Sequence, residues 1–110
     1  MSRSRFSAHE RALRSKLAKL VHDEPILRGT LSTRRITCGK PNCRCAKGHK
    51  HLCLYLTCSR HGRVEQLFIP KDLEEKVRRW VQTYHTVREL LEELSEASWH
   101  DLRTQKARRP

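Results

Sequence analysis

The apolar residues near the start of the chain repeat with the spacing of an amphipathic helix. Ser7 and Glu10 form an S-x-x-E capping box, so we expect this helix to begin near Ala8. Pro25, which follows two acidic residues, is expected to end it. The apolar positions recur three and four residues apart and share one helix face: Leu13, Leu17, Leu20 and Val21.

A second, longer helix is predicted after Pro70, from Asp72 to about Ala97. Its apolar positions alternate in steps of four and three, which is the heptad spacing of a coiled-coil seam: Leu73, Val77, Trp80, Tyr84, Val87, Leu91 and Leu94. We expect the two helices to pack as an antiparallel hairpin. A homodimeric coiled coil is the alternative, because the first helix covers only part of the longer seam.

Between the helices the pattern changes to the alternation of β-strands. Residues 29–37 favour a strand or an extended arm, and residues 51–58 alternate strictly, with three leucines on one face. Turn residues then lead to another apolar run over residues 64–69, so the two runs predict a β-hairpin.

The predicted fold class is therefore α+β. It consists of an N-terminal helix, a cysteine-rich zinc-knuckle loop with a small antiparallel hairpin or sheet, and a long C-terminal helix packing antiparallel on the first. We expect one compact domain over residues 1–102 and a basic, disordered tail over residues 103–110.

The charge is unevenly distributed along the chain. The net charge is +12, from 24 Lys and Arg against 12 Asp and Glu. No acidic residue lies between Glu24 and Glu65, whereas nine basic ones do, so +9 of the +12 falls in the middle. A positive surface of this kind attracts polyanions, which makes nucleic acid, DNA or RNA, the expected partner. The alternative is a merely solvated cationic face.

Six basic residues of this stretch are the predicted nucleic-acid contacts: Arg34, Arg35, Lys40, Arg44, Lys47 and Lys50. Tyr55 is a candidate for stacking on an unpaired base, although a single tyrosine on a strand more often serves packing.

Five cysteines lie close together in sequence, an odd number that disfavours a simple disulfide framework. The chain has no apolar run of the roughly 20 residues that a membrane span needs, and its basic N-terminus lacks the apolar core of a secretory signal. We therefore expect a cytoplasmic protein, where thiols stay reduced and clustered cysteines favour metal.

Cys38, Cys43 and Cys45 are predicted to bind one structural Zn²⁺ ion. Three thiolates leave one tetrahedral position, for which we favour His51 at the start of the hairpin strand, with Cys53 as the alternative. A site with four protein ligands is closed and would be structural. The competing interpretation is a set of reduced cysteines without metal.

These residues resemble an uncharacterised bacterial family, a small domain of unknown function, over roughly residues 8–98. The resemblance rests on a C-G-K-P-x-C-R-C-A segment with a following Gly and His, on the hairpin strand, and on an I-P-K helix start: Cys38 to Ala46, Gly48, His51, Leu54 to Leu56 and Ile69 to Lys71. Its members are often encoded beside transposase genes. The resemblance thus implies a role with mobile DNA or its RNA, and a transposase as a partner.

The chain departs from this family at two points. Where the family has a His-Gly-Pro-Tyr run, this chain has His51 followed by Leu52, Cys53 and Leu54, so Cys53 remains open as the fourth ligand. It also has fewer aromatic residues in the hairpin, which argues against base stacking.

The predicted function is that of a small zinc-binding, nucleic-acid-binding protein, accessory to a mobile element. The alternative is a protein-interaction adaptor that pairs with a transposase or with itself through the seam from Leu73 to Leu94. We expect no enzymatic activity, because the chain lacks paired carboxylates near its histidines, a Gly-rich phosphate loop and a C-x-x-C redox pair.

Overall fold

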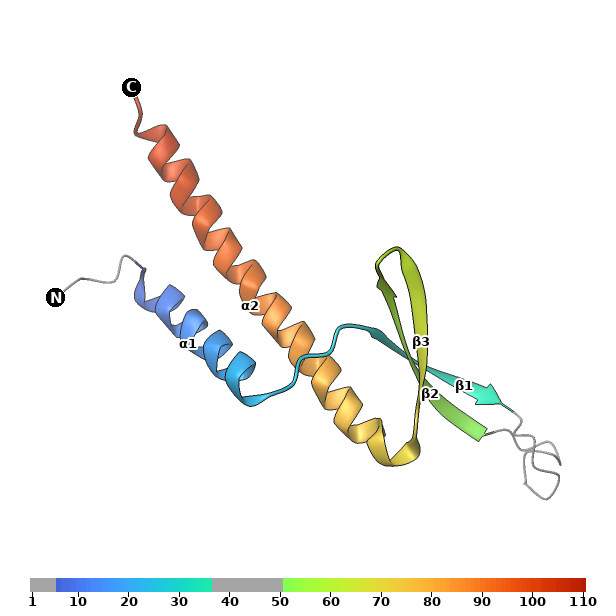
Figure 1. Ribbon diagram of the computed structural model, residues 1–110. Helices are drawn as coiled ribbons and strands as arrows, with labels where there is room; N and C mark the ends of the chain where they lie inside the picture. The colour runs from blue at the N-terminus through green and yellow to red at the C-terminus, as the bar shows by residue number, and fades with distance from the viewer. Residues whose placement is uncertain (1–5, 37–50) are drawn as a thin grey trace, which may run out of the picture. The chain divides into compact units, whose positions relative to one another are not determined.

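The structure, a computed structural model (Figure 1), describes residues 6–36 and 51–110, apart from the side chains of Ile36 and His51. Its contacts divide the chain into two compact units. The sheet unit is Leu27–Val81, and the helical unit combines the described residues up to Ile26 with Gln82–Pro110. Helices and strands follow one another as predicted, so the mixed α+β class is confirmed. The single compact domain over residues 1–102 stays a prediction.

The sheet unit contains three antiparallel strands in the order β1-β2-β3 (Figure 1). These are β1 (Thr30–Ile36), β2 (His51–Arg60) and β3 (Arg63–Ile69). The predicted hairpin is confirmed as β2 and β3. The residues expected to form a strand or an arm form β1, which pairs with β2. His61 and Gly62 connect β2 to β3 with φ angles of 52° and 75°. Two positive φ angles are what a type I′ hairpin turn requires.

One face of the sheet packs on the first turns of α2 (Glu74–Ala107) to make the core of the sheet unit. The core lies where Leu54 pairs with Ile69 and where Leu56 pairs with Leu31. It comprises five buried residues and two partly buried ones: Leu54, Leu56, Ile69, Val77 and Val81, with Leu27 and Leu31. The predicted alternation is confirmed at two of its three leucines, but Leu52 is exposed because the core ends before it.

The helical unit begins with α1 (Ala8–Asp23), whose ends are those predicted. The Ser7 hydroxyl accepts a hydrogen bond from the backbone N–H of Glu10 at 3.1 Å, as the capping box requires. The backbone N–H of Glu24 donates to the carbonyl of Leu20 at 3.0 Å, after which the chain is extended. Within this unit, α1 and residues 82–107 of α2 run in opposite directions (Figure 1).

The second helix is longer than predicted. A 3-10 turn, η2 (Lys71–Leu73), precedes α2, and α2 continues to Ala107, past the expected end near Ala97. Residues 103–107 are thus helical instead of belonging to a disordered tail. No Gly or Pro interrupts residues 71–109, and basic side chains in a last turn interact favourably with the helix dipole.

The buried face of α2 departs from the predicted heptad seam. Val81 and Leu90 are buried although they lie outside the seam, whereas the seam residues Leu73 and Leu91 are exposed. The physical reason is that α2 packs on the sheet through Val77 and Val81, while its later residues belong to the helical unit. A single straight seam therefore does not describe its buried side.

Candidate nucleic-acid interface

Two of the six predicted nucleic-acid contacts lie in the described part of the chain. Arg34 and Arg35 are consecutive residues of β1 and both are exposed. Because side chains alternate along a strand, they lie on opposite faces of the sheet. The other four lie outside the described residues: Lys40, Arg44, Lys47 and Lys50.

The three predicted cysteine ligands also lie outside the described residues: Cys38, Cys43 and Cys45. His51 is the first residue of β2 and pairs with Ile36, the last residue of β1. Residues 37–50 therefore lie in sequence between two paired strand residues. Cys53, the alternative ligand, is half-buried and pairs with Arg34. Across residues 6–36 and 51–110, no three His, Cys, Asp or Glu side chains come close enough to hold a metal ion.

The face of the sheet opposite Leu54 and Leu56, which we call the outer face, carries an arginine stacked on an aromatic ring. The guanidinium carbon of Arg34 lies 4.7 Å from the centre of the Tyr55 ring. The same guanidinium donates a hydrogen bond to Oε1 of Gln66 at 3.4 Å. The three residues come from three strands and lie along one diagonal of the sheet, so Arg34 reaches across the central strand.

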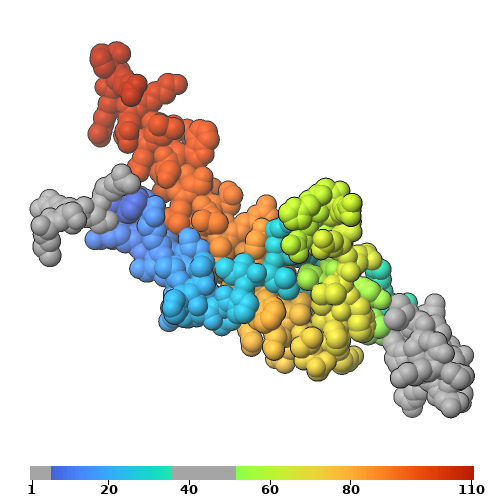
Figure 2. Space-filling model, viewed as in Figure 1, coloured from blue at the N-terminus to red at the C-terminus, as the bar shows by residue number. Residues whose placement is uncertain are grey.

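A second aromatic ring stands beside Tyr55 on the outer face. Phe68 pairs with Tyr55 across β2 and β3, and the two ring centres are 5.8 Å apart at an interplanar angle of 65°. This edge-to-face arrangement is a favourable one for aromatic pairs. Every residue of β3 before Ile69 is exposed, and in Figure 2 much of this hairpin lies at the surface. Phe68 itself keeps 49% of its surface exposed.

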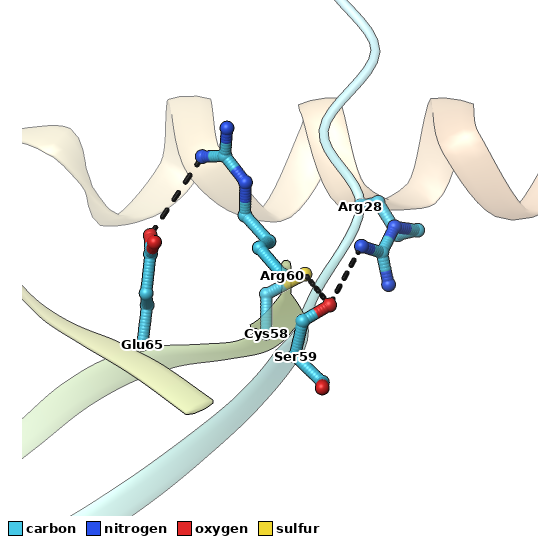
Figure 3. A network of polar contacts seen from close by, with 5 residues as sticks. All are labelled: Arg28, Cys58, Ser59, Arg60 and Glu65. Carbon is cyan, nitrogen blue, oxygen red and sulfur yellow. Dashed lines mark hydrogen bonds and ion pairs between the residues drawn. The ribbon is translucent and has the colours of Figure 1, made fainter. Parts of the chain in front are cut away.

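Basic side chains also gather at the hairpin end of the sheet (Figure 3). The Arg28 guanidinium donates to the carbonyl oxygen of Ser59 at 2.9 Å, and the Cys58 thiol lies 3.7 Å from the same oxygen. Arg60 contacts the Glu65 carboxylate at 3.7 Å, with both side chains more than half exposed. An exposed ion pair of this kind contributes little stability, so Arg60 remains available to an anion.

The charge of the sheet is therefore strongly positive. Within the three described strands Glu65 is the single acidic residue, and it faces Arg60. Arginines occupy both ends of the sheet: Arg34 and Arg35 at one end, Arg60 and Arg63 at the other. In the described strands arginines thus outnumber acidic residues by four to one.

The sequence pattern singled out Tyr55 alone on this face, and the structure adds Phe68 and Gln66. The signal that could have found them is the two-residue turn at His61 and Gly62. A two-residue loop pairs Arg60 with Arg63, and counting outward from that pair brings Tyr55 opposite Phe68.

The chain belongs to a family of domains of unknown function, DUF6788, whose model matches residues 7–79. The match spans α1, the three strands, the cysteine-bearing stretch and the first six residues of α2, and it ends before Leu91 and Leu94. No curated protein and no solved structure matches the chain. In the part of the chain that the structure describes, neither helix is long and apolar enough to cross a lipid bilayer.

Proposed function

We propose that this protein binds nucleic acid through its basic sheet and the adjoining cysteine-bearing stretch. The observation that carries the proposal is the charge of the sheet, whose described strands contain four arginines and one carboxylate. Phosphate contacts with Arg and Lys supply the affinity, and sequence-independent binding is the minimum expected. The family match covers this region in full.

The proposed zinc site would organise the basic residues of the stretch from 37 to 50. Its ligands are Cys38, Cys43, Cys45 and His51, with Cys53 as the alternative to His51. Since Ile36 and His51 are paired, a metal bound here would be held against the end of the sheet that carries Arg34. Lys40, Arg44, Lys47 and Lys50 would then extend the positive surface of the sheet. The ion has a structural role in this proposal.

The test compares two triple variants that remove the same charge. Arg34→Gln, Arg35→Gln and Arg44→Gln remove it from the proposed interface, while Arg88→Gln, Arg103→Gln and Lys106→Gln remove it from α2. Binding of a fluorescein-labelled single-stranded DNA or RNA is measured by anisotropy between about 50 and 200 mM salt. The interface triple is expected to weaken binding at least about tenfold and to flatten the salt dependence by about 0.7 for each phosphate contact removed from a single strand.

The α2 triple is the matched control and is expected to retain most of the affinity. Equal losses in the two triples would show that net charge alone attracts the probe. Unchanged binding in the interface triple would remove these three arginines from the assignment.

The biological setting of the proposal is a mobile element. We infer that the protein is accessory to a transposase and acts on its DNA or RNA, which would suit a small basic domain that contributes binding and no chemistry. The lack of enzymatic activity and the cytoplasmic location stay predictions.

A second candidate function, protein-protein pairing, is favoured by a groove within the helical unit. Apolar side chains of α1 and α2 line it together: Leu17, Ala18, Val21, Leu91 and Leu94. Val21 and Leu91 are 53% and 52% exposed, which is unusual for side chains at a helix-helix contact. A second copy of the chain or a transposase helix would bury them.

Light scattering with size exclusion tests this alternative. If the groove pairs two copies, the wild type should be a concentration-dependent dimer and Leu91→Glu a monomer, with Glu92→Gln, next to it on the helix, as control. A stable dimer whose measured mass does not change when nucleic acid is added would favour the adaptor function.

A further inference from the structure

We propose that the outer face of the sheet is a stacking platform for unpaired bases, formed by Tyr55 and Phe68 with Arg34 beside them. The ligand class is single-stranded nucleic acid. This inference rests on the proposed nucleic-acid binding and specifies that the nucleic acid is single-stranded.

The first support is the exposure of the aromatic pair. Tyr55 lies in the central strand and Phe68 beside it, on the face opposite the buried Leu54. An apolar ring left in water forgoes the favourable free energy of burial, so a half-exposed phenylalanine next to a second ring is a costly surface for a small domain. Because the two rings are inclined at 65°, a base that stacks on the face of one ring contacts the other from the side, and burying that apolar surface recovers part of this free energy.

The second support is the set of polar groups around the rings. Arg34 lies 4.7 Å from the Tyr55 ring centre, where its guanidinium plane can continue a stack or contact a phosphate. The Gln66 side chain accepts from Arg34 and retains an amide NH₂ group for the edge of a base. Arg34 and Gln66 thus form one hydrogen-bonded polar cluster next to Tyr55, with groups that suit a nucleotide.

The third support is that this face carries Arg34 and no acidic side chain at its described strand positions. The described outer-face positions of the three strands include no carboxylate: Thr30, Ser32, Arg34, Cys53, Tyr55, Thr57, Ser59, Val64, Gln66 and Phe68. Glu65, the single acid of the strands, lies on the core side together with its partner Arg60. A polyanion therefore meets no repulsive group among these side chains.

The geometry favours unpaired over paired bases. In a duplex each base is stacked between its neighbours, so its flat face is inaccessible to a protein ring. A single strand can turn its bases onto an exposed aromatic surface, and such stacking is tolerant of sequence. We therefore expect preference for strandedness and little preference for base order.

The experiment separates bases from phosphates. Three fluorescein-labelled probes are compared by anisotropy with the full chain: an oligothymidine of about 12 nucleotides, an abasic oligomer of the same length and charge, and a duplex of that length. The wild type is expected to bind oligothymidine at least about tenfold more tightly than the abasic oligomer. Phe68→Leu and Tyr55→Leu should bring that ratio toward one and leave affinity for the abasic oligomer unchanged.

Leu67→Ala is the matched control, because Leu67 is the adjacent residue of β3, is 60% exposed and lies on the other face. Its ratio should equal that of the wild type. Arg34→Lys keeps the charge and loses the planar group, so it should lower the ratio while preserving the salt dependence. Thermal melting establishes that each variant is folded.

Photocrosslinking of the wild type to an oligomer of 5-bromodeoxyuridine, with the crosslinked residues identified by mass spectrometry, tests the contact between bases and the two rings without any variant. Crosslinks at Tyr55 or Phe68 are expected, and crosslinks confined to other residues would overturn the platform. Binding of all three probes with equal affinity would also overturn it and leave phosphate binding intact. Failure to bind any probe would overturn both the platform and the proposed function.

Discussion

Ile36 and His51 are paired across β1 and β2. Between them in sequence lie the three predicted cysteine ligands, so both ends of that stretch are held at neighbouring positions of one sheet. The loop-closure cost of bringing the ligands together is lower when the sheet already joins the ends. A metal bound by these ligands and by His51 would therefore lie next to the end of the sheet where β1 and β2 pair.

The protein should contain about one zinc ion per chain when purified without added metal. Cys43→Ser is expected to lose the ion, because three ligands hold zinc far more weakly than four. Its melting temperature should fall by at least about 5 °C, as each kcal/mol lost corresponds to about 4–8 °C in a small domain. Cys58→Ser, whose thiol is near the Ser59 carbonyl at the other end of β2, is the control and should keep its zinc. Metal-free, fully folded wild type would contradict the site.

The fourth ligand can be identified by comparing two single variants. His51→Ala should weaken zinc affinity at least about tenfold in a competition titration with a chromogenic chelator. Cys53→Ser should leave the affinity close to that of the wild type if His51 is the ligand. The reverse order would make Cys53 the ligand, which its position two residues further along β2 also allows.

Gly29 is predicted to be intolerant of a side chain. A Cβ atom at this position would lie 2.5 Å from Cδ1 of Leu56, a core side chain, and 3.3 Å from the Thr57 carbonyl oxygen. Gly29→Ala should therefore destabilise the protein by about 1–3 kcal/mol, measured as a lower urea midpoint. In a double-mutant cycle the same change on a Leu56→Ala background should cost less, since the Leu56 side-chain contacts are gone and only the 3.3 Å contact with the Thr57 carbonyl oxygen remains. If the losses in the free energy of unfolding of the two single variants simply add, the cost of Gly29→Ala does not come from contact with Leu56.

Two leucines of the hairpin should differ sharply in their effect on stability. Leu54 is 1% exposed at the centre of the core, so Leu54→Ala is expected to cost about 2–5 kcal/mol. Leu67→Ala removes the same atoms from an exposed site on β3, and the expected cost is within about 0.5 kcal/mol. Urea denaturation of both variants checks the register, because a shift of one residue would exchange buried and exposed positions.

Much of the local structure could be read from short segments of sequence. Ser7 with Glu10 and Pro25 determined where α1 begins and ends, since a capping side chain and a missing N–H act within a few residues. The alternation around Leu54 determined that β2 is a half-buried strand. The distribution of charge along the chain could also be predicted from sequence, because counting acidic and basic residues requires no knowledge of the fold.

Only the tertiary structure decided which partner each apolar face meets. Leu67 and Phe68 are adjacent and both apolar, and nothing local separates the core side from the outer face. The hairpin register places Phe68 opposite Tyr55, but only the packing of Leu54 and Ile69 on Val77 decides that this pair faces away from the core. In the same way the heptad spacing of α2 could not reveal that Val81 would meet a sheet while Leu91 stays exposed. Periodicity encodes which residues share a face, whereas burial depends on neighbours distant in sequence.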